Sequence, residues 1–192
     1  MNIASDHTII VSPLGKVENA LCEHVGKQIR RKFGFQTDVA DLLNDTEFAL
    51  NAERRQYHST PILEKLEMAA SERALKVLAI TDVDLFIPIL THVYGEAQLG
   101  GKAAIVSTFR LKDDFKVFTA DAFKERIEKE AIHELGHTFK LLHCKDHKCI
   151  MHYCRSIRDV DRKTDSLCRY CRIMLEDEVR RIGNLEWGTG TK

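Results

Sequence analysis

The first part of the chain shows two hydrophobic spacings in turn, which predict a strand, a helix and a second strand. Residues 8–12 are a short β-branched run closed by proline and glycine, as expected of a strand. From residue 17 to 29 apolar side chains recur every four positions, the spacing of one helical face, and Phe33-Gly34 marks the end of this helix. A second strand follows over residues 35–39. This order predicts parallel strands joined by a right-handed crossover.

Helix and strand patterns alternate through the remainder of the chain, as in an α/β fold. The predicted elements are a helix over 60–69, strands over 76–80 and 103–111, a helix that begins near Thr119 or Asp121, and a last helix over 169–182. Residues 40–59 are charged and weakly patterned, so no element is assigned to them. The helix that begins near Thr119 has apolar side chains on two sides, which indicates a position in the protein interior.

Length and charge narrow the class of protein. The 192 residues suffice for one domain over 1–192, with an N-terminal part over 1–137 and a C-terminal part over 138–192. Lys and Arg (29) balance Asp and Glu (29), so no basic excess points to nucleic acid or to an anionic membrane surface. No apolar run is as long as a membrane span, and the first residues lack the pattern of a secretory signal. We therefore expect a cytoplasmic monomer whose six cysteines bind metal or stay reduced.

The predicted interior helix carries a histidine pair with metal-binding spacing. His133 and His137 are four residues apart, so they share one helical face and can hold one metal ion through their imidazole nitrogens. Glu134 lies between them, where a general base can take a proton from a metal-bound water. Together they form the H-E-x-x-H pattern of zinc hydrolases. The alternative is a charged amphipathic helix whose histidines cap a core face, and the ligand-type residues that follow argue against it.

The third metal ligand has two candidates. His143 follows His137 by six residues, which on a continued helix would turn it about 240° off the metal-binding face. It can bind the same ion only if the helix stops and the chain turns back. Metzincin peptidases have a glycine for this turn, and here the position is Lys140, which must adopt a left-handed backbone at about 1–2 kcal/mol. The alternative ligand is a carboxylate of the last helix, such as Glu176. We favour His143.

A four-cysteine set follows directly after His143. Cys144, Cys149, Cys168 and Cys171 form two close pairs, the second a C-x-x-C, and Met151 lies between the pairs. From residue 131 to 171 the chain resembles the archaemetzincins, a metzincin-clan family of zinc metalloproteases whose zinc motif runs into four cysteines with a second zinc. A redox C-x-x-C is the alternative, but a thioredoxin-type pair needs an early β-α context that this region lacks.

The resemblance implies a fold and a ligand set. The fold is metzincin-like, with a twisted mixed β-sheet, an antiparallel edge strand, a central zinc-binding helix and a C-terminal helix tied by the four-cysteine zinc site. Residues 103–111 are the best candidate for the edge strand, along which a peptide or protein substrate would bind. His133, His137 and His143 would hold a catalytic zinc and the four cysteines a structural zinc, which makes two Zn²⁺ per chain. Met151 would pack beneath the catalytic ion.

These residues predict zinc-dependent hydrolysis of peptide bonds with Glu134 as general base. The resemblance implies an aminopeptidase or a small-peptide hydrolase as the specific form, although the sequence identifies no acidic group for the substrate's ammonium. The alternative is a zinc-stabilised binding or regulatory protein with a vestigial or gated site, because the cationic side chain of Lys140 could plug the cleft. Tyr153 could reach the metal, but a half-buried tyrosine without that role is the simpler interpretation. Cys154, His147 and His152 lie nearby and are left out of both ligand sets.

Overall fold

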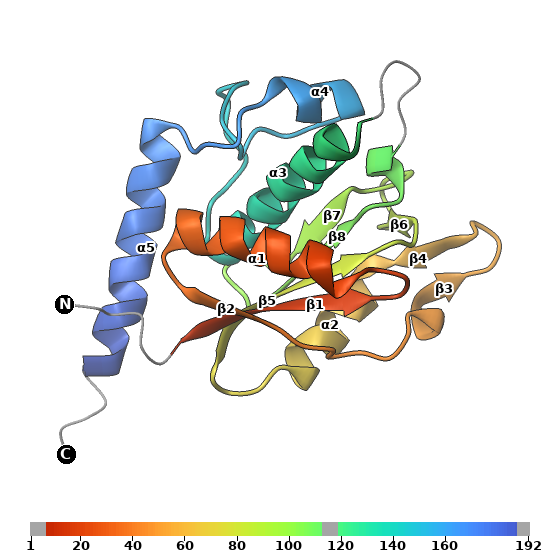
Figure 1. Cartoon of the computed structure of the whole chain (residues 1–192), viewed down its shortest axis with the longest axis horizontal. Coiled ribbons are helices and arrows are strands. Elements are labelled where there is room, and N and C mark those ends of the chain that lie inside the picture. The colour runs from red at the N-terminus through yellow and green to blue at the C-terminus, as the bar shows by residue number, and fades with distance from the viewer. Residues whose placement is uncertain (1–6, 113–118, 188–192) are drawn as a thin grey trace.

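A five-stranded mixed sheet forms the centre of the molecule (Figure 1). The computed structural model describes residues 7–112 and 119–187, and the strand order is β2-β1-β5-β8-β7. The parallel strands are β1 (Thr8–Leu14), β2 (Gln36–Val39), β5 (Ala74–Thr81) and β8 (Ala103–Ser107), and β7 (Gly95–Ala97) pairs with β8 in the antiparallel direction. The α/β class and a mixed sheet with an antiparallel edge agree with the prediction.

The antiparallel edge strand is β7, and the prediction that placed it at residues 103–111 was wrong. β8 lies between β5 and β7, and all 5 of its residues are buried. A run of consecutive apolar residues is typical of a strand covered on both faces, which is the signal that should have identified β8 as internal. The predicted strand over residues 103–111 was also too long, because β8 ends at Ser107 and Arg110–Lys112 is a short 3-10 helix, η2. β7 was missed because its three residues have no apolar pattern.

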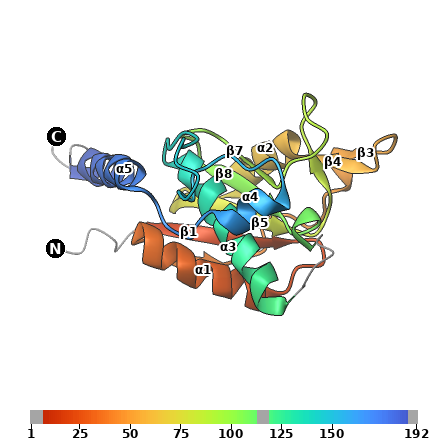
Figure 2. The ribbon, with the colours of Figure 1, turned by 90° about the horizontal axis from the view of Figure 1, so that it is seen from above.

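Two helices cover one face of the sheet and a third covers the other (Figures 1 and 2). α1 (Asn19–Phe33) and α3 (Ala120–Thr138) bury their apolar side chains in one cluster with β1, β5 and β8. α2 (Ser59–Ala69) packs in a second cluster on the opposite face. The predicted start of α3 is confirmed, since the Thr119 hydroxyl caps it by accepting a hydrogen bond from the Ala122 N–H at 3.1 Å.

A small second sheet takes two of its three strands from residues 40–59, to which the sequence assigned no element. It consists of β3 (Leu50–Asn51), β4 (Gln56–His58) and β6 (Leu85–Phe86), next to the 3-10 helix η1 (Glu47–Ala49). Side chains near this sheet anchor segment 87–93. Arg54 donates to the carbonyls of Leu90 and Thr91 at 3.0 and 2.9 Å, and Gln56 donates to the Thr91 carbonyl at 2.9 Å.

The C-terminal part packs against α3 and the end of α1. α4 (Ile157–Arg162) contacts α3, and α5 (Arg169–Trp187) lies at one end of the molecule beside the last turn of α1 (Figure 1). Lys32 of α1 forms an ion pair with Asp165 at 2.7 Å. Leu135 of α3, Met151 and Cys171 belong to the same hydrophobic cluster, so residues on both sides of position 137 share one core.

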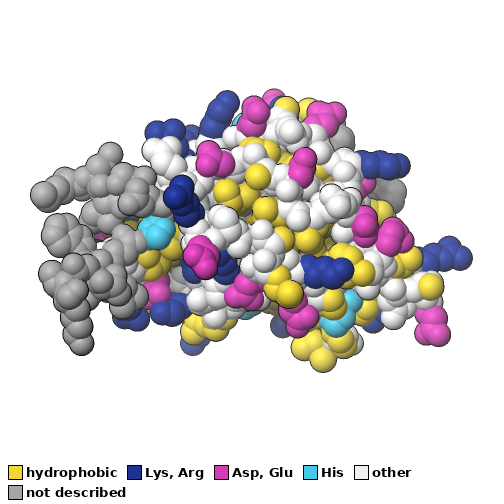
Figure 3. Space-filling model, turned by 90° about the horizontal axis from the view of Figure 1, so that it is seen from below, with side chains coloured by type: hydrophobic (Ala, Val, Ile, Leu, Met, Phe, Trp, Pro, Cys, Tyr) yellow, Lys and Arg dark blue, Asp and Glu magenta, His cyan; other side chains and the backbone are white. Residues whose placement is uncertain are grey.

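Charged side chains of both signs are interspersed on the face of the molecule that Figure 3 shows. Apolar side chains lie between them, and the mixture agrees with the balanced composition of the chain. Within residues 7–112 and 119–187, none of the helices combines the length and the apolar character that a membrane span requires.

Candidate metal centre

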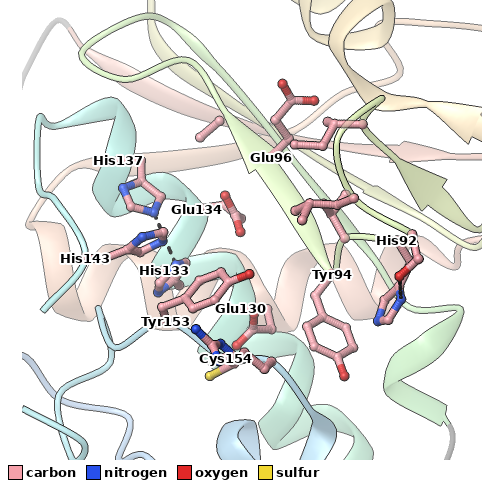
Figure 4. A pocket seen from close by; sticks show the side chains of 17 residues that line it. His92, Tyr94, Glu96, Glu130, His133, Glu134, His137, His143, Tyr153 and Cys154 are labelled. Atoms are coloured by element: carbon pink, nitrogen blue, oxygen red, sulfur yellow. Dashed lines mark hydrogen bonds between the residues drawn. The ribbon is translucent and has the colours of Figure 1, made fainter. Parts of the chain in front are cut away.

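His133 and His137 lie one turn apart on α3 and direct the same ring nitrogen toward each other. Their Nε2 atoms are 3.1 Å apart (Figure 4). His133 Nδ1 donates to the Ile150 carbonyl at 2.9 Å, and His137 Nδ1 donates to the Leu141 carbonyl at 2.7 Å. A neutral imidazole has one N–H, so both Nε2 atoms are left as bare acceptors. Two facing lone pairs need a cation between them, and a carbonyl on the other ring nitrogen is how metal-binding histidines are oriented.

The chain turns back after His137 through a left-handed residue, as the hypothesis of a third histidine ligand requires. α3 ends at Thr138, and Lys140 has a φ of 63°. The Lys140 N–H donates to the His137 carbonyl at 2.9 Å, and the Leu141 N–H donates to the Gly136 carbonyl at 3.1 Å. This is the Schellman pattern, in which glycine usually occupies the left-handed position. The same turn places the Leu141 carbonyl against His137.

His143 completes the histidine group. Its ring centroid lies 5.3 Å from that of His133 and 4.8 Å from that of His137. One nitrogen from each of the three rings falls within a set of atoms no more than 4.8 Å apart. Nitrogens bound tetrahedrally to zinc at about 2.0–2.1 Å lie about 3.3 Å apart, so the donors fit this ion. Burial lowers the pKa of His143 and His137, and Lys163 lowers both further, so the rings are neutral, as metal ligands must be.

The two alternatives to this arrangement are not supported. Glu176, the rival ligand, lies on α5 with an exposed side chain, 3.8 Å from Arg180 and outside the histidine group. Lys140, which in the alternative interpretation could plug the cleft, directs its ammonium to Glu178 of α5 at 2.7 Å. Its side chain does not line the cavity beside the histidines.

Glu134 points into the cavity next to the histidines (Figure 4). The strand β7 passes directly against its side chain, because a Cβ on Gly95 would lie 2.5 Å from Glu134 Cγ and 2.6 Å from the Ile105 carbonyl oxygen. Only glycine therefore fits at position 95. Burial raises the pKa of Glu134 well above its ordinary value; Glu130 adds to this effect and Lys163 opposes it.

A buried ion pair lies beneath the site. Glu130 is one helical turn before Glu134, and its Oε1 is 2.7 Å from Nζ of Lys163, with side-chain exposures of 4% and 0%. The contact is an ion pair without the angles of a hydrogen bond. Burial alone would lower the pKa of Lys163, but Glu130 and Cys154 outweigh it and hold that pKa above its ordinary value. The sequence prediction missed both residues. Helical spacing could have identified Glu130, whereas nothing in the sequence places Lys163 beside α3.

These groups line a cavity of about 330 Å³ between β7, α3 and the segment that follows His143 (Figure 4). Segment 87–93 forms one wall, and Tyr153, Cys154 and Arg155 form another. The Tyr153 ring lies 5.0 Å from the His143 ring and is 41% exposed. Met151 is fully buried and packs on α3, since a Cβ on Gly136 would be 2.6 Å from its sulfur. Met151 therefore packs on the turn of α3 that carries His133 and His137, and its place beneath a catalytic ion stays a prediction.

The four predicted cysteines form a second group of donors. The sulfurs of Cys144, Cys149, Cys168 and Cys171 all lie within 4.8 Å of one another, and those of Cys144 and Cys168 are 3.7 Å apart. Tetrahedral zinc with Zn–S bonds of about 2.3 Å separates its sulfurs by about 3.8 Å, so this set also fits zinc. The Cys168 N–H donates to Cys149 Sγ at 3.3 Å. Cys154 lines the cavity and belongs to neither group.

The two donor groups share two short segments of chain. His143 and Cys144 are neighbours in sequence and belong to different groups. Cys149 lies in the cysteine group, while the next residue, Ile150, accepts the hydrogen bond that orients His133. A metal in the cysteine group would therefore fix the backbone that positions the histidines.

Similarity to known proteins identifies the family. A family model described as Peptidase family M54 matches residues 35–177, which include both donor groups. This chain belongs to peptidase family M54. Its relatives are the archaemetzincins, and the family is one of zinc metallopeptidases, so the chain is an enzyme of the hydrolase class.

Individual archaemetzincins match over most of their length. That of Methanocaldococcus jannaschii is 35% identical over 171 residues, covering 88% of this chain and 93% of the relative. That of Archaeoglobus fulgidus is 37% identical over 166 residues, covering 85% and 95%. The crystal structure of the archaemetzincin from Methanopyrus kandleri has a TM-score of 0.78 at 30% identity, covering 92% of this chain and 97% of that one. The fold is therefore that of the archaemetzincins.

Proposed function

We propose that this member of peptidase family M54 hydrolyses peptide bonds with a zinc ion held by His133, His137 and His143 and with Glu134 as general base. The observation that carries the proposal is the pair of facing Nε2 atoms, each ring fixed by a hydrogen bond from Nδ1 to a carbonyl. Three donors leave a fourth position open, as in catalytic zinc sites, where the ion acidifies a water and polarises the scissile carbonyl.

Glu134 carries out the proton transfers in this proposal. Its carboxylate takes a proton from the attacking water and passes it to the leaving amine. Burial and Glu130 raise its pKa, which makes it a stronger base, while Lys163 favours its ionised form. Gly95 allows the edge of β7 to lie against this carboxylate. A peptide bound as an added strand on β7 would thus present its backbone carbonyl beside Glu134.

The four cysteines would hold a second zinc with a structural role, which gives two Zn²⁺ per chain. Four thiolates leave no open coordination position. The Cys168 N–H that donates to Cys149 Sγ, and the sulfur spacing of 3.7 Å between Cys144 and Cys168, support this assignment. A monomer in the cytoplasm remains a prediction from the sequence, which size-exclusion chromatography and fractionation check.

The aminopeptidase form that the resemblance implies also remains a prediction. It needs a carboxylate that is free to bind the substrate's terminal ammonium. Among the described residues that line the cavity, the carboxylates besides Glu134 are Glu96 and Glu130. Two hydroxyls at the start of α2 donate to Glu96, and Lys163 pairs with Glu130. Peptide hydrolysis is thus better supported than this particular mode of it.

A binding or regulatory protein with a gated site is the alternative function. This alternative was based on a lysine side chain in the cleft. Lys140 instead pairs with Glu178, so that basis is lost. It also predicts no turnover in the zinc-loaded wild type. We therefore favour the enzyme.

The test compares the zinc-loaded wild type with Glu134→Gln, and with Glu176→Gln as the matched control. Cleavage of a mixed peptide library is followed by mass spectrometry. We expect Glu134→Gln to lose about 10²–10⁴-fold in rate with its zinc content unchanged, because it lacks the base. Glu176→Gln, which alters an exposed glutamate outside the cavity, should match the wild type. Equal rates for wild type and Glu134→Gln, or cleavage by neither, would refute the proposal.

A further inference from the structure

The outer edge of β7 offers backbone hydrogen-bonding groups from two residues. On its inner edge the Tyr94 carbonyl accepts from the Ser107 N–H at 2.7 Å, and the Gln98 N–H donates to the Ala103 carbonyl at 3.0 Å. Bonding groups alternate along an antiparallel strand, so Glu96 also faces inward, toward β8. The N–H and C=O groups of Gly95 and Ala97 then face outward, toward the cavity that both residues line.

Segment 87–93 blocks one end of this exposed strand edge, so that a peptide cannot pair with β7 beyond that point. The Val93 N–H already donates to the Leu85 carbonyl of β6 at 3.0 Å, so a peptide cannot pair at that position. The segment is not a loose flap, because Arg54 and Gln56 hold its carbonyls from the small sheet. A bound peptide must end or leave the strand there.

The closed end lies close to the reacting carboxylate. Gly95 marks the position of Glu134 along β7, since the two residues are in contact. Val93, where the open edge ends, is the second residue before Gly95. A peptide paired with β7 therefore has room for a short segment beyond the bond that faces Glu134.

The charges near the closed end suit a carboxylate better than an ammonium. Arg155 lines the cavity with an exposed side chain, and within the described residues its guanidinium has no ion-pair partner. Its sequence neighbour Cys154 lies near Tyr94. The pKa of Tyr94 is raised to about 12 by burial and by the nearby Glu130 and Cys154. Figure 4 likewise shows Glu130 and Cys154 between the histidines and Tyr94. Because Arg155 directly follows Cys154 in the chain and lines the same cavity, we infer that it lies in the wall near Tyr94, where the edge of β7 closes.

The carboxylates that could instead bind an ammonium are already occupied. Glu96 points away from the histidines in Figure 4, and the hydroxyls of Ser59 and Thr60 donate to it. Glu130 is paired with the buried Lys163. Strand polarity agrees with this distribution of charge, because a peptide antiparallel to β7, the slightly more stable pairing, directs its C-terminus toward Val93.

We propose that the cleft binds the C-terminal end of a peptide, with its terminal carboxylate against Arg155, and that the enzyme removes a short C-terminal segment. The inference rests on the proposed peptidase function and specifies its substrate. Hydrolysis adds one water across the C–N bond: the acyl carbon gains the hydroxyl and the amine gains a proton, so no further reactant is needed.

The test separates binding from hydrolysis by using the zinc-loaded Glu134→Gln variant. Four versions of one peptide are titrated calorimetrically: unmodified, N-acetylated, C-terminally amidated, and blocked at both ends. We expect acetylation to leave Kd nearly unchanged and amidation to raise it about tenfold or more, as expected for loss of a hydrogen bond to a charged group. When Arg155→Ala is added to the Glu134→Gln variant, the peptide acid and the peptide amide should bind with the same Kd. Arg158→Ala, which removes an exposed arginine outside the cavity, is the matched control and should keep the difference between acid and amide.

Product analysis with the wild type then locates the cleaved bond. Mass spectrometry should find short fragments from the C-terminal end of the acetylated peptide. Weaker binding after acetylation, equal binding of acid and amide, or no binding of any peptide would each overturn the inference. Cleavage of internal bonds irrespective of end groups would overturn it while leaving the peptidase function intact. A wild type that binds with the expected preference but cleaves nothing would refute the peptidase function, and with it the removal of a C-terminal segment, while the binding of the C-terminal end would stand.

Discussion

Lys140 and Glu178 form an ion pair, with Nζ 2.7 Å from Oε1, that joins the end of α3 to α5. The lysine occupies the left-handed position of the helix cap with a φ of 63°. Its backbone thus does what glycine does in metzincins, while its side chain leaves the metal cleft free. The departure from the family pattern changes the surface between α3 and α5 and leaves the histidine geometry intact.

Lys140→Gly should therefore leave turnover essentially unchanged. Relief of the left-handed backbone, about 1–2 kcal/mol, is offset by the entropy of glycine and by loss of a partly exposed ion pair. Thermal unfolding should shift little, whereas Lys140→Val, which is β-branched and resists positive φ, should destabilise the protein. Strong activation of Lys140→Gly in peptidase assays would instead mean that the lysine gates the site.

The Glu130–Lys163 pair should affect both stability and the pH–rate profile. Lys163→Met leaves Glu130 buried and unpaired, and we expect it to lower the free energy of unfolding by about 3–5 kcal/mol. Because Lys163 lowers the pKa of Glu134, its loss should also move the acid limb of kcat/KM to higher pH. The double variant Lys163→Met/Glu130→Gln should recover most of the stability. A single variant as stable as the wild type would contradict the role of the pair.

Gly95→Ala should impair activity more than a glycine change elsewhere. The added Cβ would meet Glu134 Cγ at 2.5 Å and the Ile105 carbonyl at 2.6 Å, so β7 or the base must shift. Gly34→Ala is the matched control, since Gly34 has a φ of 81° but no atom within 4 Å of the added Cβ. Both variants lose stability, and only Gly95→Ala should lose turnover. Equal rates in the two would place β7 outside the reaction site.

The metal-free protein should lose stability as pH falls below 6.5. Burial, together with Lys163, lowers the pKa of His133, His137 and His143 below the ordinary value of 6.5. At pH values between 6.5 and the lower pKa values of the folded state, the unfolded chain binds more protons than the folded protein. The free energy of unfolding therefore decreases as the pH is lowered through this range. The slope is at most about 1.4 kcal/mol per pH unit for each histidine. Urea unfolding from pH 7.5 to 5.5 measures it, and His137→Gln should reduce the slope.

Local sequence patterns predicted α1, α2, α3 and α5 and the donor residues because each depends on spacing within one segment, whereas the six-residue helix α4 was not predicted. Four-residue spacing was enough for α1 and for the histidine pair of α3, and the cysteine pairs are similarly local. The edge strand was misplaced because three residues of β7 have no period that distinguishes them from a turn. Lys163 and Arg155 join the site through tertiary packing of the segment after Met151. The direction of the Lys140 side chain depends on Glu178, which lies on another helix.

Zinc content per chain tests the central claim most directly. Elemental analysis would be made on the wild type, on His143→Ala and on His147→Ala, an exposed histidine outside the donor groups. The account predicts two zinc ions in the wild type and in His147→Ala, and one in His143→Ala. Two ions in His143→Ala would mean that His143 is not needed to hold the metal, and would contradict the site described here.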